Sequence, residues 1–120
     1  MHTLQAIIEK AYEERASLSP ARVSTEIKQA VHEAIALLDS GKARVAEKLA
    51  NNAWHTHQWL KKAVLLFFRL HDSAVIPGTF TQYFDKVPVK FAHDSAQAMA
   101  AAGVRVVPPA VARQGAYIAP

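Results

Sequence analysis

The chain has 120 residues, of which 51% are hydrophobic and 20% are charged. A chain of this length and composition can bury about two-thirds of its unfolded surface, which excludes disorder as its main state and predicts a compact unit with a radius of gyration of about 14 Å. It has no cysteine, which excludes disulfides, thiolate catalysis and sulfur-rich zinc sites. Because it also has no apolar run near the roughly 20 residues of a spanning helix and no signal-peptide pattern, we expect a soluble, cytoplasmic protein with no membrane partner.

Charge is distributed unevenly along the chain. Residues 1–40 carry six acids and four bases, a net charge of −2, whereas residues 41–120 carry four acids and ten bases, a net charge of +6. An electropositive field favours an anionic partner. It does not distinguish the phosphate of a cofactor from a dicarboxylate or a nucleic acid.

Two amphipathic helices are predicted in the first forty residues. Apolar residues in the segment 4–15 recur at the three-and-four spacing of one helix face, and Thr3 is a plausible N-cap. The pair Ser19–Pro20 ends this pattern and places a proline where it can open the next helix. The second helix ends at Ser40–Gly41, where glycine is free to adopt a positive φ. The two helices are expected to pack as an antiparallel pair.

A short hairpin and a central helix are predicted next. Apolar and charged residues alternate over 44–49, and the segment 53–56 can return beside them after the turn at Asn51–Asn52. A third helix is expected from Thr56 or His57 to about Leu70. Few of its faces are polar, so it should form the centre of the core, with Trp59 buried.

The segment 71–91 is expected to form loops and short extended pieces, because turn residues and prolines interrupt it. Asp94 or Ser95 is predicted to cap a short alanine-rich helix that Gly103 ends. The predicted fold class is therefore α+β and mainly helical, with a helical hairpin, a short β-hairpin and a buried central helix.

The last seventeen residues have a different character. Val104–Val107 is predicted to be strand-like, and Pro108–Pro109 to form a stiff extended link. Residues 112–118 place small or apolar side chains at the spacing of one hexapeptide coil. Such coils form a β-helix only by stacking, so a single coil indicates the beginning of a further domain. A frayed apolar C-terminus explains the same spacing.

Two groups of residues suggest binding sites but have simpler explanations. His55 and His57 would share one face of a strand, as metal ligands do, but no third ligand lies nearby in the sequence, so surface histidines are the commoner interpretation. His2, His32, His71 and His93 form no recognisable cluster. The bases Lys61, Lys62 and Arg69 accompany aromatic residues that the helix must bury. They indicate a solvated helix face, and we expect no nucleic-acid partner.

Arg105 and Arg113 are the strongest candidates for a binding role. They are the only charged residues after Asp94, and no acid lies near them in the sequence. A guanidinium without a partner suits two-pronged capture of a carboxylate or phosphate, although ordinary exposed arginines look the same. No nucleophile elbow, glycine-rich phosphate loop or paired carboxylates are present, and we expect no metal site.

Four strings of residues exceed what helical or strand periodicity requires. They are RVAEK (44–48), HQWLKKAVLL (57–66), YFDKVP (83–88) and RVVPPA (105–110). In this order and spacing they closely resemble the N-terminal portion of the tetrahydrodipicolinate N-succinyltransferases of lysine and diaminopimelate biosynthesis. The resemblance covers nearly the whole chain.

The resemblance implies an N-terminal domain over residues 1–104 and the truncated start of a left-handed β-helix of hexapeptide coils over 105–120. It implies a homotrimeric acyltransferase that moves succinyl from succinyl-CoA, its co-substrate, to the amino group of a ring-opened dicarboxylate, with no further cofactor. The catalytic residue of the family lies in the β-helix, so none is expected in this chain. The family's arginine in the R-V-V-P-P string matches Arg105, which is expected to hold a substrate carboxylate. On these grounds the chain alone should be inactive; the alternative is a stand-alone helical interaction module without catalysis.

Overall fold

The computed structural model describes residues 2–120 and contains four α-helices and two small antiparallel strand pairs. The helices are α1 (His2–Glu13), α2 (Thr25–Asp39), α3 (Gln58–Arg69) and α4 (Ala96–Ala102), and a single 3₁₀ turn covers Arg15–Ser17. The strands are β1 (Ala46–Lys48), β2 (Trp54–Thr56), β3 (Ala74–Ile76) and β4 (Tyr83–Asp85). The mainly helical α+β class predicted from the sequence is confirmed.

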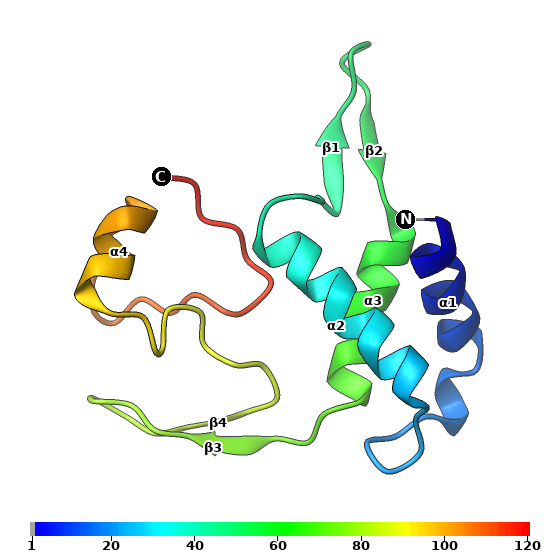
Figure 1. Cartoon of the computed structure of the whole chain (residues 1–120), viewed down its shortest axis with the longest axis horizontal. Coiled ribbons are helices and arrows are strands. Elements are labelled where there is room, and N and C mark those ends of the chain that lie inside the picture. Colours follow the sequence, from blue (N-terminus) through cyan, green and yellow to red (C-terminus); the bar gives the residue numbers. More distant parts are fainter. Residues whose placement is uncertain (1) are drawn as a thin grey trace.

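The core lies between α1, α2 and α3, which pack against one another (Figure 1). Ile8, Val31, Leu60 and Leu66 are the largest fully buried side chains, and each of the three helices contributes at least one. Trp59 is only 7% exposed, as predicted. Burial of these apolar faces, rather than helix propensity, supplies most of the stability of such short helices.

The β1–β2 hairpin projects from the helices, and β3, β4, α4 and the C-terminal segment form a looser second layer beside α2 (Figure 1). The molecule measures 43 × 40 × 20 Å, and its radius of gyration is 16.1 Å. This exceeds the roughly 14 Å of a compact chain of this length because the hairpin and the second layer extend away from the core. None of the helices within residues 2–120 is long and apolar enough to cross a membrane.

Helix boundaries follow their caps. The hydroxyl of Ser24 accepts a hydrogen bond from the amide of Ile27, and that of Ser95 accepts one from Ala98. Gly41, just beyond α2, has φ +74°, and Gly103, the C-cap of α4, has φ +67°, as the sequence predicted. The prediction that Pro20 opens α2 is wrong, because Ser19 and Arg22 close a turn first.

Three further local predictions are wrong. Thr3 does not cap α1, which already includes His2. Val104–Val107 is not a strand, because within residues 2–120 no neighbouring strand pairs with it and valine's preference for strands depends on such packing. Pro108–Pro109 forms a turn rather than an extended link, closed by the amide of Ala110 on the carbonyl of Val107 at 2.8 Å.

Candidate functional site

The C-terminal segment follows a defined path across the molecule. An antiparallel bridge joins Val89 to Arg113. In this bridge the amide of Lys90 donates to the carbonyl of Ala112 at 2.9 Å, and the amide of Gln114 donates to that of Pro88 at 2.9 Å. Further along, the Tyr117 ring covers Gly41 so closely that a Cβ there would lie 2.8 Å from the ring. Residues 112–117 are therefore positioned by contacts with residues 88–90 and with Gly41.

An ion pair fastens this segment to the end of α2. The Lys90 ammonium lies 2.8 Å from Asp39 Oδ1 and 3.0 Å from the Asp39 carbonyl oxygen. The same Oδ1 accepts the amide of Gly115 at 2.9 Å. The C-terminal end of a helix dipole is negative, so the Asp39 carboxylate alone would be unfavourable there. The Lys90 ammonium offsets this negative charge. We call Asp39, Lys90 and the Gly115 amide the tail latch.

Arg113 is not the free guanidinium that the sequence suggested. Its Nη2 atom lies 2.7 Å from Asp85 Oδ2, and its guanidinium carbon lies 5.6 Å from the centre of the Phe68 ring. The backbone of Lys86, and then the Arg113 guanidinium, hydrogen-bond Asp85 and hold the pKa of its carboxyl below its usual value. No acid lies near Arg113 in the sequence, but Asp85 approaches from 28 positions away, so the expectation of an unpaired guanidinium is wrong. Arg113 instead links β4 to the C-terminal segment.

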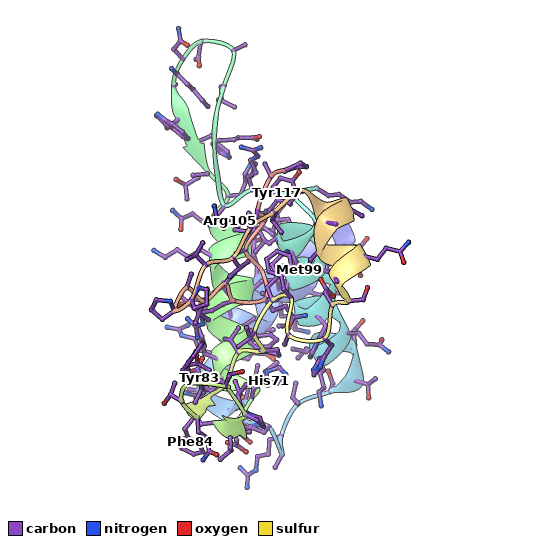
Figure 2. The ribbon with its side chains drawn as sticks, turned by 90° about the vertical axis from the view of Figure 1, so that its left-hand side faces the viewer. His71, Tyr83, Phe84, Met99, Arg105 and Tyr117 are labelled. Carbon is purple, nitrogen blue, oxygen red and sulfur yellow. The ribbon has the colours of Figure 1, made fainter. Side chains whose placement is uncertain are left out.

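Arg105 does retain a free side chain. It is exposed, and within residues 2–120 it forms no ion pair and no side-chain hydrogen bond. Figure 2 shows it near the middle of the molecule, below the projecting hairpin, with the β4 aromatics Tyr83 and Phe84 toward the lower end. All five guanidinium donors are thus available to an incoming anion.

A hollow of about 360 Å³ lies beside Arg105. Its other lining residues are apolar or small, among them Phe91, Val104, Val111 and Ile118. A free cation at the edge of an apolar wall is suited to a ligand that combines a carboxylate with a hydrocarbon chain. Arg113 also lines an apolar hollow, of about 290 Å³, but its guanidinium is paired with Asp85. Of the two arginines that the sequence suggested for binding, only Arg105 combines an apolar hollow with an unpaired guanidinium.

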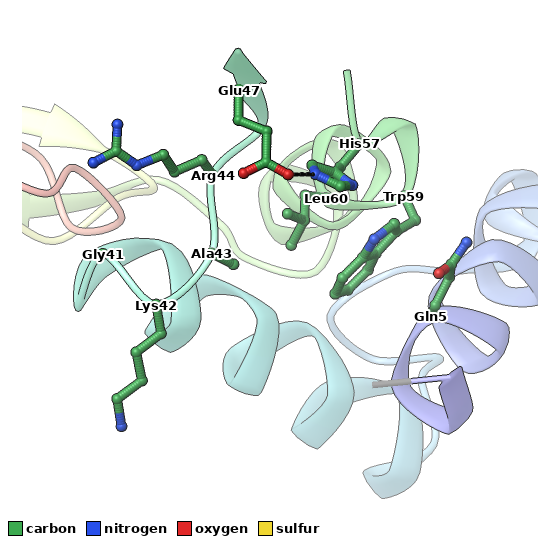
Figure 3. Close-up of a pocket in the computed structure, with 9 residues that line it drawn as sticks. All are labelled: Gln5, Gly41, Lys42, Ala43, Arg44, Glu47, His57, Trp59 and Leu60. Atoms are coloured by element: carbon green, nitrogen blue, oxygen red, sulfur yellow. Dashed lines mark hydrogen bonds and ion pairs between the residues drawn. The ribbon is translucent and has the colours of Figure 1, made fainter. Parts of the chain in front are cut away.

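A second hollow, of about 450 Å³, lies between α1, the α2–β1 loop and the start of α3 (Figure 3). His57 Nε2 and Glu47 Oε1 are 2.8 Å apart on its wall, and Trp59 lies beside His57, with Gln5 of α1 beyond it. The side chains of Lys42 and Arg44 point away from this group (Figure 3). No group of three potential metal-ligating side chains within residues 2–120 is arranged to hold an ion.

Two histidines that are distant in sequence come together. The rings of His32 on α2 and His71 after α3 lie 5.2 Å apart, and His71 stacks on Phe67 at 3.9 Å. Burial, followed by the charges of His71 and Lys28, lowers the pKa of His32. The expectation that these histidines form no cluster is therefore wrong for His32 and His71. His2 has a side chain outside the described part of the structure.

The basic residues of α3 do not form one exposed surface. Arg69 donates from Nε to the carbonyl of Leu18 at 3.0 Å and from Nη2 to that of Ala16 at 3.1 Å. It therefore ties α3 to the segment after α1. Lys62 lies 4.0 Å from Glu13, and Lys61 is exposed. The helix face was correctly predicted as polar, but Arg69 has a structural role.

Comparison with known proteins identifies one family. The family model described as the N-terminal part of tetrahydrodipicolinate N-succinyltransferase matches residues 3–70. Relatives named 2,3,4,5-tetrahydropyridine-2,6-dicarboxylate N-succinyltransferase are 59% identical in Aeromonas hydrophila and 56% identical in Aeromonas salmonicida, each over all 120 residues. One from Escherichia coli is 57% identical over 119 residues, or 99% of the chain. The chain spans 43% of the length of each of these relatives.

Proposed function

Because the chain belongs to the tetrahydrodipicolinate N-succinyltransferase N-terminal family, we propose that it is the N-terminal part of an enzyme that succinylates ring-opened tetrahydrodipicolinate in diaminopimelate and lysine biosynthesis. In this reaction the substrate amine attacks the thioester carbonyl of succinyl-CoA, the C–S bond breaks as an amide forms, and the CoA thiolate leaves and takes up the proton that the amine loses. The observation that carries the proposal is identity of 56–59% sustained along the whole chain.

Arg105 is proposed to bind a carboxylate of the dicarboxylate substrate. Its support is the exposed, unpaired guanidinium beside an apolar hollow. A planar guanidinium can hold both oxygens of a carboxylate at once, which fixes the direction of the substrate as well as binding it. Arg113 serves as an internal comparison, since Asp85 already occupies its guanidinium.

We further propose that residues 105–120 lead into a left-handed β-helix, with residues 1–104 as the preceding domain, and that the whole enzyme is a cytoplasmic homotrimer. The hexapeptide spacing of residues 112–118 supports the first part of this proposal. The tail latch has a physical role in this proposal, because its contacts would fix the position at which the first coil of the β-helix begins. Arg105 would then stand at the junction between the two domains.

A chimera tests the proposal. This chain replaces the equivalent N-terminal segment of the Aeromonas hydrophila relative, and thiol release from succinyl-CoA is followed with tetrahydrodipicolinate as acceptor. We expect turnover by the chimera and by the intact relative, and none above a buffer control by the purified 120-residue chain. A chimera that melts cooperatively but does not turn over would contradict the proposal and favour a stand-alone interaction module. Turnover by the 120-residue chain alone would contradict the expectation that the catalytic residue lies outside this chain.

A further inference from the structure

The β1–β2 hairpin gathers three polar side chains on one face. Glu47 of β1 is the cross-strand partner of His55 on β2. The ladder continues one step beyond β2, because the amide of His57 donates to the carbonyl of Val45 at 2.7 Å. Side chains alternate between the two faces of a strand, so Glu47, His55 and His57 share a face.

The two imidazole rings are spaced as they would be around a shared ion. Their centres are 4.6 Å apart, and their planes cross at 80°. Two imidazoles bound to one ion at about 2.0–2.1 Å from each nitrogen have their ring centres roughly 5 Å apart. The observed spacing of the ring centres therefore matches that of two imidazoles on one ion, which each ring would bind with the nitrogen that it turns toward the other. His55 is exposed and His57 is 30% exposed, so an ion can reach both.

Glu47 sets the tautomer of His57. A carboxylate can only accept, so the 2.8 Å contact from His57 Nε2 to Glu47 Oε1 places a proton on Nε2. In the neutral ring the lone pair is then on Nδ1. A histidine that gives one ring N–H to a carboxylate and its other nitrogen to a metal is a recurrent arrangement, in which the carboxylate orients the ring and raises its basicity.

We propose that His55 and His57 form a two-histidine site for a first-row divalent transition-metal ion, with Glu47 as its positioning residue and water in the other coordination positions. Imidazole favours Ni²⁺, Cu²⁺ and Zn²⁺, whereas Mg²⁺ and Ca²⁺ prefer oxygen ligands. The backbone of His57 is fixed on both sides, since its amide joins the ladder and its carbonyl accepts the amide of Leu60 at the start of α3. With two protein ligands the ion would be exchangeable. The proposal is independent of succinyl transfer.

Titration calorimetry of the untagged chain with NiCl₂ and with ZnCl₂, in a non-coordinating buffer near neutral pH, tests the site. We expect one equivalent of either ion to bind and no binding of Mg²⁺ at the same concentration. His55→Ala and His57→Ala should each weaken the affinity at least about tenfold, because a single imidazole remains. Glu47→Gln should weaken it by about ten- to a hundredfold, as loss of a carboxylate partner does elsewhere. The matched control is His32→Ala, which removes a histidine of the other pair.

Circular dichroism melts establish that each variant is folded. If His57→Ala unfolds, the test of the metal site rests on His55→Ala, because His55 is exposed. The proposal is overturned if the wild-type chain binds neither ion at millimolar concentration. It is also overturned if His55→Ala binds as the wild type does, if His32→Ala causes the loss instead, or if Mg²⁺ binds through the same residues.

Discussion

Removing the Asp39 carboxylate should release the C-terminal segment from the core. Asp39→Ala eliminates the acceptor that both the Lys90 ammonium and the Gly115 amide use, at 2.8 and 2.9 Å. The Lys90 side chain is only 15% exposed, so water replaces the lost contact incompletely. Asp39→Asn retains an oxygen acceptor but loses the charge, and separates the two contributions.

The expected size of the effect follows from these contacts. Hydrogen bonds to charged groups contribute about 1.5–3 kcal/mol. Two effects reduce the net loss: the Asp39 side chain is 34% exposed, and an acid at a helix C-terminus is itself unfavourable by about 0.3–1 kcal/mol. We therefore expect Asp39→Ala to lower the free energy of unfolding by about 2 kcal/mol and Asp39→Asn by about 1 kcal/mol.

Urea denaturation of the 120-residue chain measures the loss, and hydrogen exchange at the Gly115 amide measures release of the segment. Asp72→Asn is the control, because Asp72 is exposed and forms no ion pair within residues 2–120; it should change stability by less than about 0.5 kcal/mol. If Asp39→Ala behaves like this control and exchange at Gly115 is unchanged, the latch does not hold the segment.

Two further predictions concern the core and the second layer. Trp59→Ala should lower the free energy of unfolding by about 3–5 kcal/mol. Leu65→Ala on the same helix, where Leu65 is 43% exposed, should lower it by less than about 1 kcal/mol. Equal losses in chemical denaturation would mean that Trp59 is not in the core. The Asp85 contact with Arg113 should stabilise the protein fully above the ordinary Asp pKa and lose that contribution as the pH falls through the lowered pKa of the folded state. Asp85→Asn should abolish this part of the acid dependence of the melting temperature, and an unchanged profile would contradict the assignment.

Local signals predicted most of the elements. These signals are patterns within short stretches of the sequence. They are the apolar face of α3, the alternating residues around β1 and β2, and the serine and glycine at the ends of α4. Pro20 shows how two local signals compete: proline is favoured at a first helical position, but Ser24 offers a side-chain cap and α2 begins after it. The competing cap therefore determined the helix start.

The candidate site could be predicted only in part. Arg105 is a candidate because no acid is near it in the sequence and because it matches an arginine of the family, and within residues 2–120 it forms no ion pair. Its role in substrate binding stays a prediction. The same argument failed for Arg113, whose partner is 28 positions away. The pairing of Asp39 with Lys90 spans 51 positions and follows from how the second layer packs on α2. No local pattern signals such a contact.

The most direct test of the central claim, that this chain supplies the substrate-carboxylate contact of a succinyltransferase, is steady-state kinetics of Arg105→Lys in the Aeromonas hydrophila chimera. Lysine keeps the charge but loses the planar pair of donors. Loss of one charged contact of about 1.5–3 kcal/mol should raise the KM for the dicarboxylate roughly ten- to a hundredfold. The KM for succinyl-CoA and the melting temperature should change little. An unchanged KM for the dicarboxylate, or a lower melting temperature with both KM values unaltered, would contradict the claim.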